Sequence, residues 1–327
     1  MKIEQAREMC EQVNGLVSDV FVTGDEILLK KIVAAFLGGG HILFEDNPGL
    51  GKTLLVKTIA RVTGCNWNRI QFTPDLMPSD IVGTKIWRGD ISSFQLERGP
   101  VFTNFLLADE INRAMPKTQS ALLEAMEERQ VTIEGETHAL KEPFTVMATQ
   151  NPIEMEGTYP LPEAQMDRFM VKLSMGYVES LDQEAEILRR RIEWRKDDPT
   201  DNLEAAITQD DLLALQQTVE NVYVDDNILH YISAIVRKTR DNNKIRIGSS
   251  PRGGLALLKL ARAIALVSGR DFVVPDDVKM VAAEALTHRI IIDVEYALEG
   301  LEPGEVLSEI IGEIEVPKQL SARPEHA

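Results

Sequence analysis

A short glycine-rich segment that ends in a lysine and a threonine carries the clearest chemical signal in this chain. It lies between an apolar run at 41–44 and a helical pattern at 52–62, and it consists of Asn47, Pro48, Gly49, Leu50, Gly51, Lys52, Thr53 and Leu54. In such a strand–turn–helix, backbone N–H groups and the positive end of the helix bind phosphate oxygens. Lys52 would neutralise the β- and γ-phosphates, and the Thr53 hydroxyl would bind Mg²⁺. The segment predicts a Walker A loop, with an accidental glycine-rich turn as the alternative.

One position of this segment departs from the Walker A pattern. Asp46 stands where the G-x-x-x-x-G-K-[ST] pattern has its first glycine. That position is at the start of the loop, farther from the phosphates than Gly49 or Gly51. We therefore expect the aspartate to be tolerated and to affect little beyond nucleotide affinity.

Two adjacent carboxylates, Asp109 and Glu110, follow a second apolar strand pattern at 104–108. In a Walker B arrangement, Asp109 would hold Mg²⁺, usually through water, and Glu110 would orient and deprotonate the attacking water. The alternative is a pair of acids at the N-cap of the next helix. The phosphate loop upstream favours the Walker B interpretation.

An amide side chain follows the next strand pattern, at 144–149. In a parallel sheet, Asn151 would lie beside the two Walker strands, where an amide can position the lytic water against the γ-phosphate. A turn-forming asparagine before Pro152 is the alternative.

Strand patterns that alternate with helical ones place these residues in an α/β fold. A fourth strand pattern lies at 170–173, and the alternation predicts a parallel sheet with helices on both faces. Two segments interrupt it, at about 80–94 and at about 131–140. The second has the pattern of a β-hairpin that turns at Glu134 and Gly135.

From about residue 179 the chain changes character. Amphipathic helix patterns follow one another at 186–195, 209–221, 226–240, 254–268 and 276–287. We therefore predict a P-loop NTPase αβα core at 1–178 and an α-helical second domain at 179–327.

Composition limits the classes of partner. The 327 residues include 35 Lys and Arg against 52 Asp and Glu, a net charge of −17. This charge disfavours broad contact with nucleic acid or an anionic membrane. The apolar run at 32–37 is too short to span a bilayer, and the charged N-terminus is not a secretory signal. With two cysteines, Cys10 and Cys65, expected to be buried and reduced, a cytoplasmic location is predicted.

Longer motifs resemble those of the MoxR branch of the AAA+ ATPases. The segments that carry the resemblance are 107–114 (LADEINRA), 117–128 (KTQSALLEAMEE), 148–152 (ATQNP), 156–169 (EGTYPLPEAQMDRF) and 249–252 (SSPR). The similarity covers the whole core and extends into the second domain. These motifs are far more specific than a phosphate loop alone.

The resemblance implies an ATPase core, a helical lid and a hexameric or similar homo-oligomeric ring. Asn151 matches the sensor 1 position, Arg168 the arginine finger that reaches a neighbour's site, and Arg252 the sensor 2 position. Surface salt bridges are the alternative for both arginines. The segments at 80–94 and 131–140 match the helix-2 insert and the pre-sensor 1 hairpin of this branch.

The resemblance also implies where the adenine base would bind. Val22 and Gly24 precede a helix near the N-terminus, where AAA+ proteins usually hold the base, and a glycine lets the backbone approach the purine. An ordinary helix start capped by Asp25 is the alternative.

Similarity to this branch implies an ATPase that uses ATP and Mg²⁺ for chaperone-like remodelling, maturation or activation of partner protein complexes. The partner would be a separate chain, and partners of this branch often carry a von Willebrand A-type domain. A magnesium-chelatase-like motor subunit, a nucleic-acid-stimulated motor and a non-hydrolysing switch are alternatives. Nucleic acid is disfavoured because the predicted hairpin carries Glu134, Glu136 and His138 where a DNA-gripping hairpin would present Lys or Arg.

Overall fold

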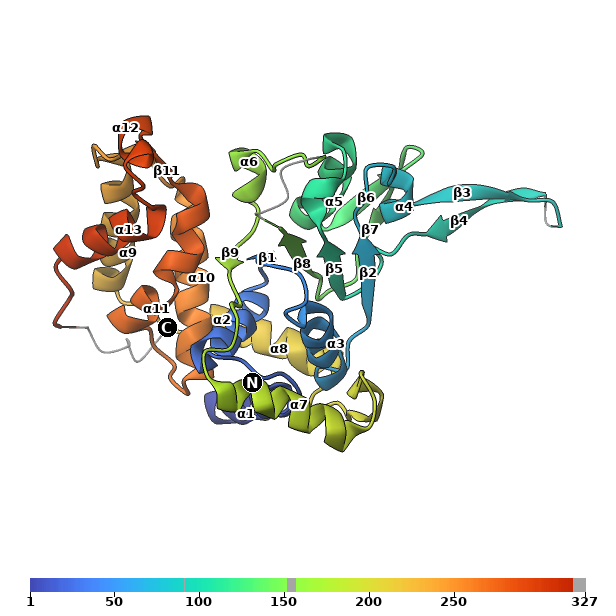
Figure 1. The fold of residues 1–327 in the computed structure, drawn as a ribbon, viewed down its shortest axis with the longest axis horizontal. Helices are drawn as coiled ribbons and strands as arrows, with labels where there is room; N and C mark the ends of the chain where they lie inside the picture. Colours follow the sequence, from blue (N-terminus) through green and yellow to red (C-terminus); the bar gives the residue numbers. More distant parts are fainter. Residues whose placement is uncertain (91, 152–156, 320–327) are drawn as a thin grey trace.

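A five-stranded parallel sheet forms the centre of the computed structural model, which describes residues 1–90, 92–151 and 157–319 (Figure 1). The strand order is β2-β5-β8-β1-β9. The strands are β1 (Ile42–Glu45), β2 (Trp67–Gln71), β5 (Phe105–Asp109), β8 (Thr145–Gln150) and β9 (Val171–Leu173). Because all neighbours pair in parallel, the carboxyl ends of the strands share one edge of the sheet. The expected α/β core is confirmed.

Each central strand contributes side chains to two separate apolar clusters, because successive residues of a strand point to opposite faces. On β1, Ile42 and Phe44 belong to one cluster and Leu43 to the other. The helices that contribute to the first cluster include α1 (Ile3–Val20), α2 (Glu26–Leu37) and α3 (Lys52–Val62). The second includes α5 (Pro116–Glu128) and the short helix α4 (Pro78–Val82). The sheet is thus buried on both faces, as long apolar strand runs require.

Beyond residue 179 the described chain is mainly helical. Its helices are α7 (Leu181–Trp194), α8 (Gln209–Glu220), α9 (Asp226–Arg240), α10 (Pro251–Val267), α11 (Pro275–Leu286), α12 (Val294–Leu298) and α13 (Pro303–Glu313). Buried residues of α8 to α11 and α13 belong to the same apolar cluster as α1 to α3. The helical part and one face of the sheet therefore share a continuous core. The boundary expected at 178/179 falls just before α7 and stays a prediction.

One small sheet lies among these helices, where the sequence patterns indicated only helices. Strand β10 (Ile245–Ile247) pairs antiparallel with β11 (Ile291–Ile292). Both strands are too short to produce a clear period-2 pattern, so their pairing depends on how the helices around them pack.

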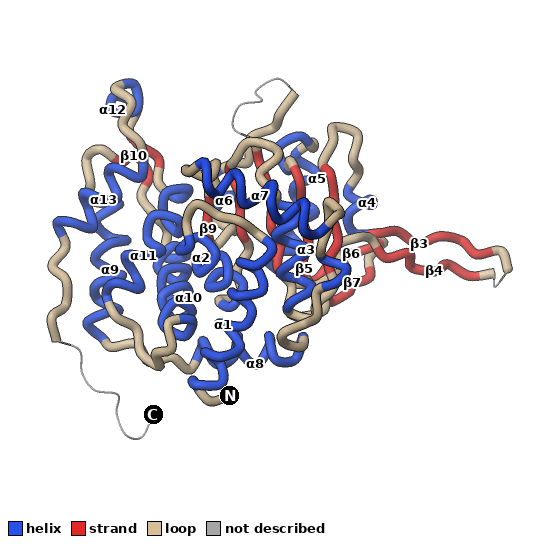
Figure 2. The backbone as a smooth tube through the Cα atoms, turned by 60° about the horizontal axis from the view of Figure 1, so that its bottom comes forward, coloured by secondary structure: helices blue, strands red, loops and turns tan. Residues whose placement is uncertain are grey.

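Two β-hairpins interrupt the core. The first overlaps the interruption expected at about 80–94, which was not predicted to be a hairpin, and the second coincides with the hairpin pattern at about 131–140. The first, β3 (Gly83–Arg88) with β4 (Ser93–Arg98), projects from the body next to α4 (Figures 1 and 2). On it, Trp87 and Phe94 are exposed, with ring centroids 5.2 Å apart. The second joins β6 (Gln130–Ile133) to β7 (Glu136–Ala139).

The turn of the second hairpin has a defined conformation. Glu134 and Gly135 both have positive φ angles, 48° and 84°. Two such residues between paired strands form the type of turn that matches the strand twist.

In the described part of the chain, no helix combines the length and the apolar character needed to cross a membrane.

Candidate active site

Residues 46–51, which belong to the predicted phosphate loop, lie between β1 and α3. Gly49 and Gly51 have φ angles of 89° and 80°, which favour glycine. A Cβ on Gly51 would also lie 3.1 Å from the ring of Phe21. The Lys52 ammonium donates to the carbonyl oxygens of Asp46 and Asn47, at 3.2 and 3.1 Å, so it points back over the loop. Gly49 and Gly51 therefore adopt backbone conformations that other residues reach only under strain.

A cavity of about 290 Å³ lies over this loop, at the carboxyl ends of the strands. Lys52, Thr53, Asp109, Glu110 and Asn151 all line it. The sequence-predicted phosphate, metal and water-positioning residues thus meet around one space. Also among the lining residues are Asp46, Pro48, Gly49, Leu50, Gly51, Arg69, Gln71, Thr149 and Gln150.

Both strand-end carboxylates are held by polar neighbours. Asp109 Oδ1 accepts from Thr149 Oγ1 at 2.7 Å, and Asp109 Oδ2 accepts from Arg69 Nη2 at 2.6 Å. Glu110 has a positive φ of 55° and accepts from Gln71 Nε2 at 2.7 Å. The Glu110 N–H donates to Thr149 Oγ1 at 2.8 Å. Thr149 therefore fixes the carboxylate of one acid and the backbone of the next.

The alternative of a helix-capping acid pair does not fit these contacts. Glu110 precedes the short 3₁₀ helix Ile111–Arg113, but its side chain makes no capping hydrogen bond there. Instead its carboxylate lies 3.3 Å from the Arg113 guanidinium and faces the cavity. The acid pair is thus directed at the phosphate loop.

Sequence reasoning missed the contribution of β2. Arg69 and Gln71 lie two residues apart on this edge strand, so both point to the same face, and both line the cavity. Their Nη2 and Oε1 atoms are 2.8 Å apart. Most residues of β2 are polar and partly exposed, which hides the strand in an apolar pattern search. The alternation of polar and apolar residues at 69–72 (Arg, Ile, Gln, Phe) was the signal that could have found it.

The ammonium of Lys52 is partly buried beside these acids. Burial lowers the pKa of Lys52 below its ordinary value, and the carboxylates of Asp46, Asp109 and Glu110 act in the opposite direction. A cation that is partly stripped of water and faces carboxylates is suited to bind an anion with its metal counter-ion.

Asn151 lies in the cavity wall directly after β8, between the strands that carry the phosphate loop and the acid pair. Its backbone carbonyl oxygen accepts a hydrogen bond from Asn112 Nδ2 at 3.5 Å. The sensor position expected for Asn151 is therefore on the predicted side of the sheet. Residues Pro152 and Glu156 of the motifs around it lie outside the described part of the chain.

A second cavity, of about 370 Å³, adjoins the first and is mainly apolar. Val22, Gly24 and Leu54 line it. The two cavities share Pro48, Gly49, Leu50 and Gly51, and Met175, Gly176, Tyr177 and Val178 form another wall of the second. A flat apolar base beside a phosphate loop would fit here. The expectation for residues 22 and 24 therefore has a physical basis.

The alternative for this segment is also realised. Asp25 caps α2 by accepting a hydrogen bond from the Ile27 N–H at 2.8 Å. Gly24 is nonetheless close to the opposite wall, because a Cβ there would lie 3.6 Å from Val178 Cα. A capped helix and a pocket wall coexist in this segment.

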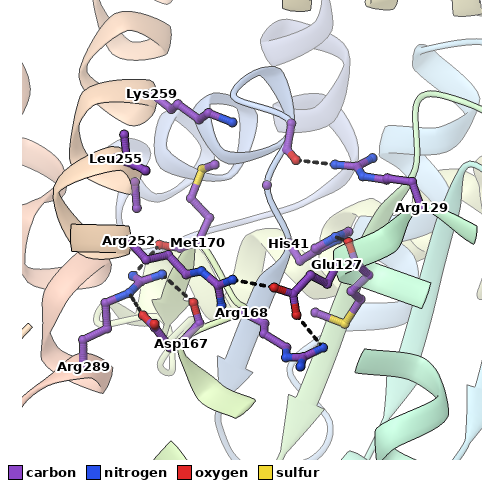
Figure 3. Close-up of a pocket in the computed structure, with 14 residues that line it drawn as sticks. His41, Glu127, Arg129, Asp167, Arg168, Met170, Arg252, Leu255, Lys259 and Arg289 are labelled. Atoms are coloured by element: carbon purple, nitrogen blue, oxygen red, sulfur yellow. Dashed lines mark hydrogen bonds and ion pairs between the residues drawn. The ribbon is translucent and has the colours of Figure 1, made fainter. Parts of the chain in front are cut away.

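Arg168 and Arg252 lie at a third cavity, of about 290 Å³ (Figure 3). Arg168 Nη1 is 2.8 Å from Glu127 Oε2, and Arg252 Nη2 is 2.6 Å from Glu127 Oε1. Lys259 also lines this cavity. The surface salt bridges considered for the two arginines are therefore present, and they share one carboxylate.

The third cavity lies at the opposite edge of the sheet from the phosphate loop. Its lining includes Gly40 and His41, which come just before β1, and Met170, which comes just before β9. The phosphate loop instead follows β1. The four residues of β1 span about 13 Å at roughly 3.3 Å each. The structure therefore does not bring Arg168 or Arg252 to the phosphate cavity of the same chain.

A buried ion pair joins the two parts of the chain behind these arginines. Arg289 Nε donates to Asp167 Oδ1 at 2.6 Å, and Arg289 is 8% exposed. Its guanidinium also donates to the carbonyl oxygens of Asp167, Phe169 and Met170. Ser250, the N-cap of α10, donates to Asp167 at 3.2 Å. The residues before β9 are thereby tied to the helical part.

The donor set at the phosphate cavity fits a triphosphate with a magnesium ion. Thr53 and Asp109 offer hard oxygen ligands, and Lys52 and Arg69 offer positive charge. Within the described residues, no group of three or more His, Cys, Asp or Glu side chains could hold a metal ion. Magnesium beside phosphates is commonly held by one or two protein ligands, with phosphate oxygens and water as its other ligands.

A parallel sheet of this order, a phosphate loop, strand-end acids and a helical second part define a P-loop ATPase of the AAA+ class. The family model described as "ATPase family associated with various cellular activities (AAA)" matches residues 41–171, and an AAA lid domain model matches residues 237–310. The chain is 42% identical to Chaperone MoxR1 of Mycobacterium tuberculosis, over 93% of this chain and 81% of that protein. It belongs to the MoxR family of AAA+ ATPases.

Two further similarities extend over nearly the whole chain. The uncharacterized protein YeaC of Bacillus subtilis is 49% identical over 94% of each chain. A crystal structure of a putative ATPase from Cytophaga hutchinsonii is 38% identical and superposes with a TM-score of 0.88, covering 97% of each chain. The expected core and helical lid are therefore a property of both this structure and a solved relative.

Proposed function

We propose that this protein hydrolyses ATP with Mg²⁺. The observation that carries the proposal is that Lys52, Asp109 and Glu110 line one cavity, which adjoins an apolar pocket of a size suited to a base. Charged residues that served only the stability of the fold would not need to line an open cavity with the predicted phosphate loop at its base. AAA+ family membership supports ATPase activity in general terms.

The proposed roles follow the geometry. The loop at 47–54 surrounds the phosphates with its backbone N–H groups, which Pro48 alone lacks, and Lys52 balances their charge. Thr53 and Asp109 would hold Mg²⁺, which neutralises charge on the phosphate oxygens. Glu110 takes the proton of the attacking water, and Asn151 orients that water. The base lies between the wall that contains Val22 and Gly24 and the wall at 175–178.

We propose that the active unit is a homo-oligomeric ring, with six subunits as the expected number. Arg168 and Arg252 lie at the opposite edge of the sheet from the phosphate cavity, so a second copy is needed to bring such cations to the nucleotide. A guanidinium supplied in this way can increase the rate by about 10³–10⁵. Arg252 then acts in trans, together with Arg168.

The energy of hydrolysis is proposed to drive chaperone-like remodelling of a partner protein complex. Support comes from the relative named Chaperone MoxR1, 42% identical to this chain. A partner with a von Willebrand A-type domain and a cytoplasmic location remain predictions from the sequence. The described cysteines, Cys10 and Cys65, are both free and buried, which is compatible with that location.

The alternative of a nucleic-acid motor is less well supported by the hairpins. The tip of the β6–β7 hairpin carries Glu134 and Glu136, and the nearby Lys85 is already paired with Glu136 at 2.5 Å. A phosphate backbone would meet more negative than positive charge there. Salt-sensitive stimulation of the ATPase by DNA would revive this alternative. Metal insertion into a porphyrin with a porphyrin-binding partner would support the chelatase-like alternative.

The test combines turnover and binding with the purified protein. Wild-type protein should release phosphate from ATP only when Mg²⁺ is present. Glu110→Gln should bind ATP with similar affinity and hydrolyse it at least about 100-fold more slowly, because the general base is lost. If Glu110→Gln turns over ATP as fast as wild type, Glu110 is not the base. The same variant, held in its ATP-bound form, is the reagent for capturing the partner protein.

A further inference from the structure

Asp46, at the start of the predicted phosphate loop, accepts several hydrogen bonds from across the nucleotide site. The residue is only 6% exposed. Its Oδ1 accepts hydrogen bonds from Ser174 Oγ at 2.7 Å and from the N–H groups of Met175 and Gly176 at 3.0 and 3.3 Å. Its Oδ2 accepts from Met175 N–H at 2.9 Å. Three consecutive residues thus converge on one carboxylate.

The segment that Asp46 holds is a wall of the base pocket. Met175 and Gly176 line the apolar cavity together with Tyr177 and Val178. The next residue of the phosphate loop adds a second link, because Asn47 Nδ2 donates to the Tyr177 hydroxyl at 3.4 Å. The start of the phosphate loop is therefore bonded directly to the surface that a base would contact.

Besides these hydrogen bonds, the partly buried Met175 packs against the hydrophobic core and helps to hold this wall. Ser174, Gly176 and Tyr177 are exposed, and Tyr177 keeps 67% of its surface accessible. A largely exposed segment with few packed side chains depends mainly on its hydrogen bonds for a defined position. Charge-assisted hydrogen bonds to a carboxylate are stronger than bonds between neutral groups. The carboxylate of Asp46 is the group that supplies them here.

We propose that Asp46 is a positioning residue that holds the 174–178 wall against the phosphate loop and so couples recognition of the adenine base to phosphate binding. The inference rests on the proposed function as an ATP-binding protein. This role explains why an aspartate stands at the first glycine position of the Walker A pattern. It also predicts that restoring the glycine weakens ATP binding. Asp46 does not touch the reacting phosphate in this role.

The experiment compares a ligand that has a base with one that lacks it. Dissociation constants are measured for ATP and for inorganic tripolyphosphate, each with Mg²⁺, using wild type and Asp46→Ala. We expect ATP to bind about tenfold more weakly to Asp46→Ala, while tripolyphosphate binding changes less than about twofold. The KM for ATP should rise by a similar factor, with kcat at saturation nearly unchanged.

Further variants separate the effect of the Asp46 hydrogen bonds on the 174–178 wall from other effects. Asp46→Gly, which restores the Walker A pattern, should weaken ATP binding in the same way. Asp46→Asn keeps one acceptor oxygen and should be intermediate. Ser174→Ala removes a single donor and should give a smaller shift in the same direction, which keeps the test possible if Asp46 variants fold poorly. Asp277→Asn, at a buried carboxylate of α11 that pairs with Arg270, is the matched control and should leave both affinities unchanged.

Two results would overturn the inference. One is an equal loss of affinity for ATP and tripolyphosphate, which would place the effect of Asp46 on the phosphate loop alone. The other is unchanged ATP affinity in both Asp46→Ala and Asp46→Gly. Failure of the wild-type protein to bind ATP would instead contradict the proposed function itself, so the two failures are distinguishable.

Discussion

Arg168 and Arg252 come from different parts of the chain and contact opposite oxygens of the Glu127 carboxylate (Figure 3). Two guanidinium groups repel each other, and a carboxylate between them offsets that repulsion. Arginine also loses considerable rotamer freedom when it is held in one direction. Glu127, at the end of α5, therefore aims both cations toward the same side of the molecule.

The first prediction concerns Glu127→Gln. Loss of the shared negative charge should let the two arginines separate, so assembly-dependent ATP turnover should fall by about tenfold or more while ATP affinity stays unchanged. Phosphate release and nucleotide binding are measured at several protein concentrations. Glu220→Gln is the control, because it removes the partner of Arg262 on the same helix α10. Faster turnover in Glu127→Gln would show that Glu127 competes with phosphate and does not position the arginines.

Mixing two inactive variants tests whether Arg168 acts on a neighbouring subunit. Lys52→Ala should lose nucleotide binding but keep its arginines, and Arg168→Ala should keep its phosphate loop. If the site is shared, a mixture should regain part of the wild-type activity, because some interfaces pair an intact loop with an intact arginine. The measurement is ATP turnover against mixing ratio. Normal turnover by Arg168→Ala alone would contradict the assignment of a trans-acting arginine.

Stability should depend strongly on the buried pair of Asp167 and Arg289. Asp167→Asn leaves a guanidinium in the core without its carboxylate, although several carbonyl oxygens remain as acceptors. Loss of one partner of a buried pair costs about 3–5 kcal/mol of unfolding free energy, and the carbonyl contacts should keep the loss near the lower value. Denaturant unfolding of both proteins measures it. A difference below about 1 kcal/mol would show that the pair contributes little.

Acid should destabilise the protein partly through His41. Burial lowers the pKa of His41 to about 3, with the nearby charge of Arg129 as a second cause. Its Nδ1 accepts from the Val146 N–H and its Nε2 faces the Met126 carbonyl, so the neutral ring is the bonded form. The unfolded chain takes up a proton below about pH 6.5, and the folded chain does not until about pH 3. The stability from neutral His41 is thus complete above that range and is lost progressively as the pH falls through it.

His41→Gln keeps a donor and an acceptor but cannot titrate. Its unfolding free energy should therefore decline less steeply between pH 6 and pH 4, by about 1.4 kcal/mol per pH unit relative to wild type. The comparison uses denaturant unfolding at several pH values. His288, also buried with a pKa lowered to about 3, remains in both proteins and contributes equally. Parallel pH profiles would exclude His41 as an acid-sensitive group.

The sequence was most informative where local geometry and chemistry coincide. The phosphate loop combines residues that only a tight turn before a helix requires, so α3 begins at Lys52 as predicted. The acid pair was recognisable because an apolar strand that ends in charges is unusual. Strand β2 and its residues Arg69 and Gln71 were missed, since an edge strand needs no continuous apolar run.

The contacts of Asp46 and Glu127 could not be derived from the sequence for a different reason. Asp46 meets residues 174–176, and Glu127 meets Arg168 and Arg252, across large separations along the chain. Such pairings depend on how β9 and α10 are placed by the whole fold. A local pattern identifies a residue type, but it does not identify the partner that tertiary packing supplies.

The phosphate cavity and the two arginines, Arg168 and Arg252, lie at opposite edges of one sheet. This placement has a numerical consequence. Under the proposed arrangement, each joint between neighbouring copies completes one reaction centre. An open row of copies then always contains one centre fewer than it has chains, and a pair of chains works at half capacity. Closing the row removes both unproductive ends at once, so activity per chain should increase with each added copy and reach its maximum only when the last copy meets the first.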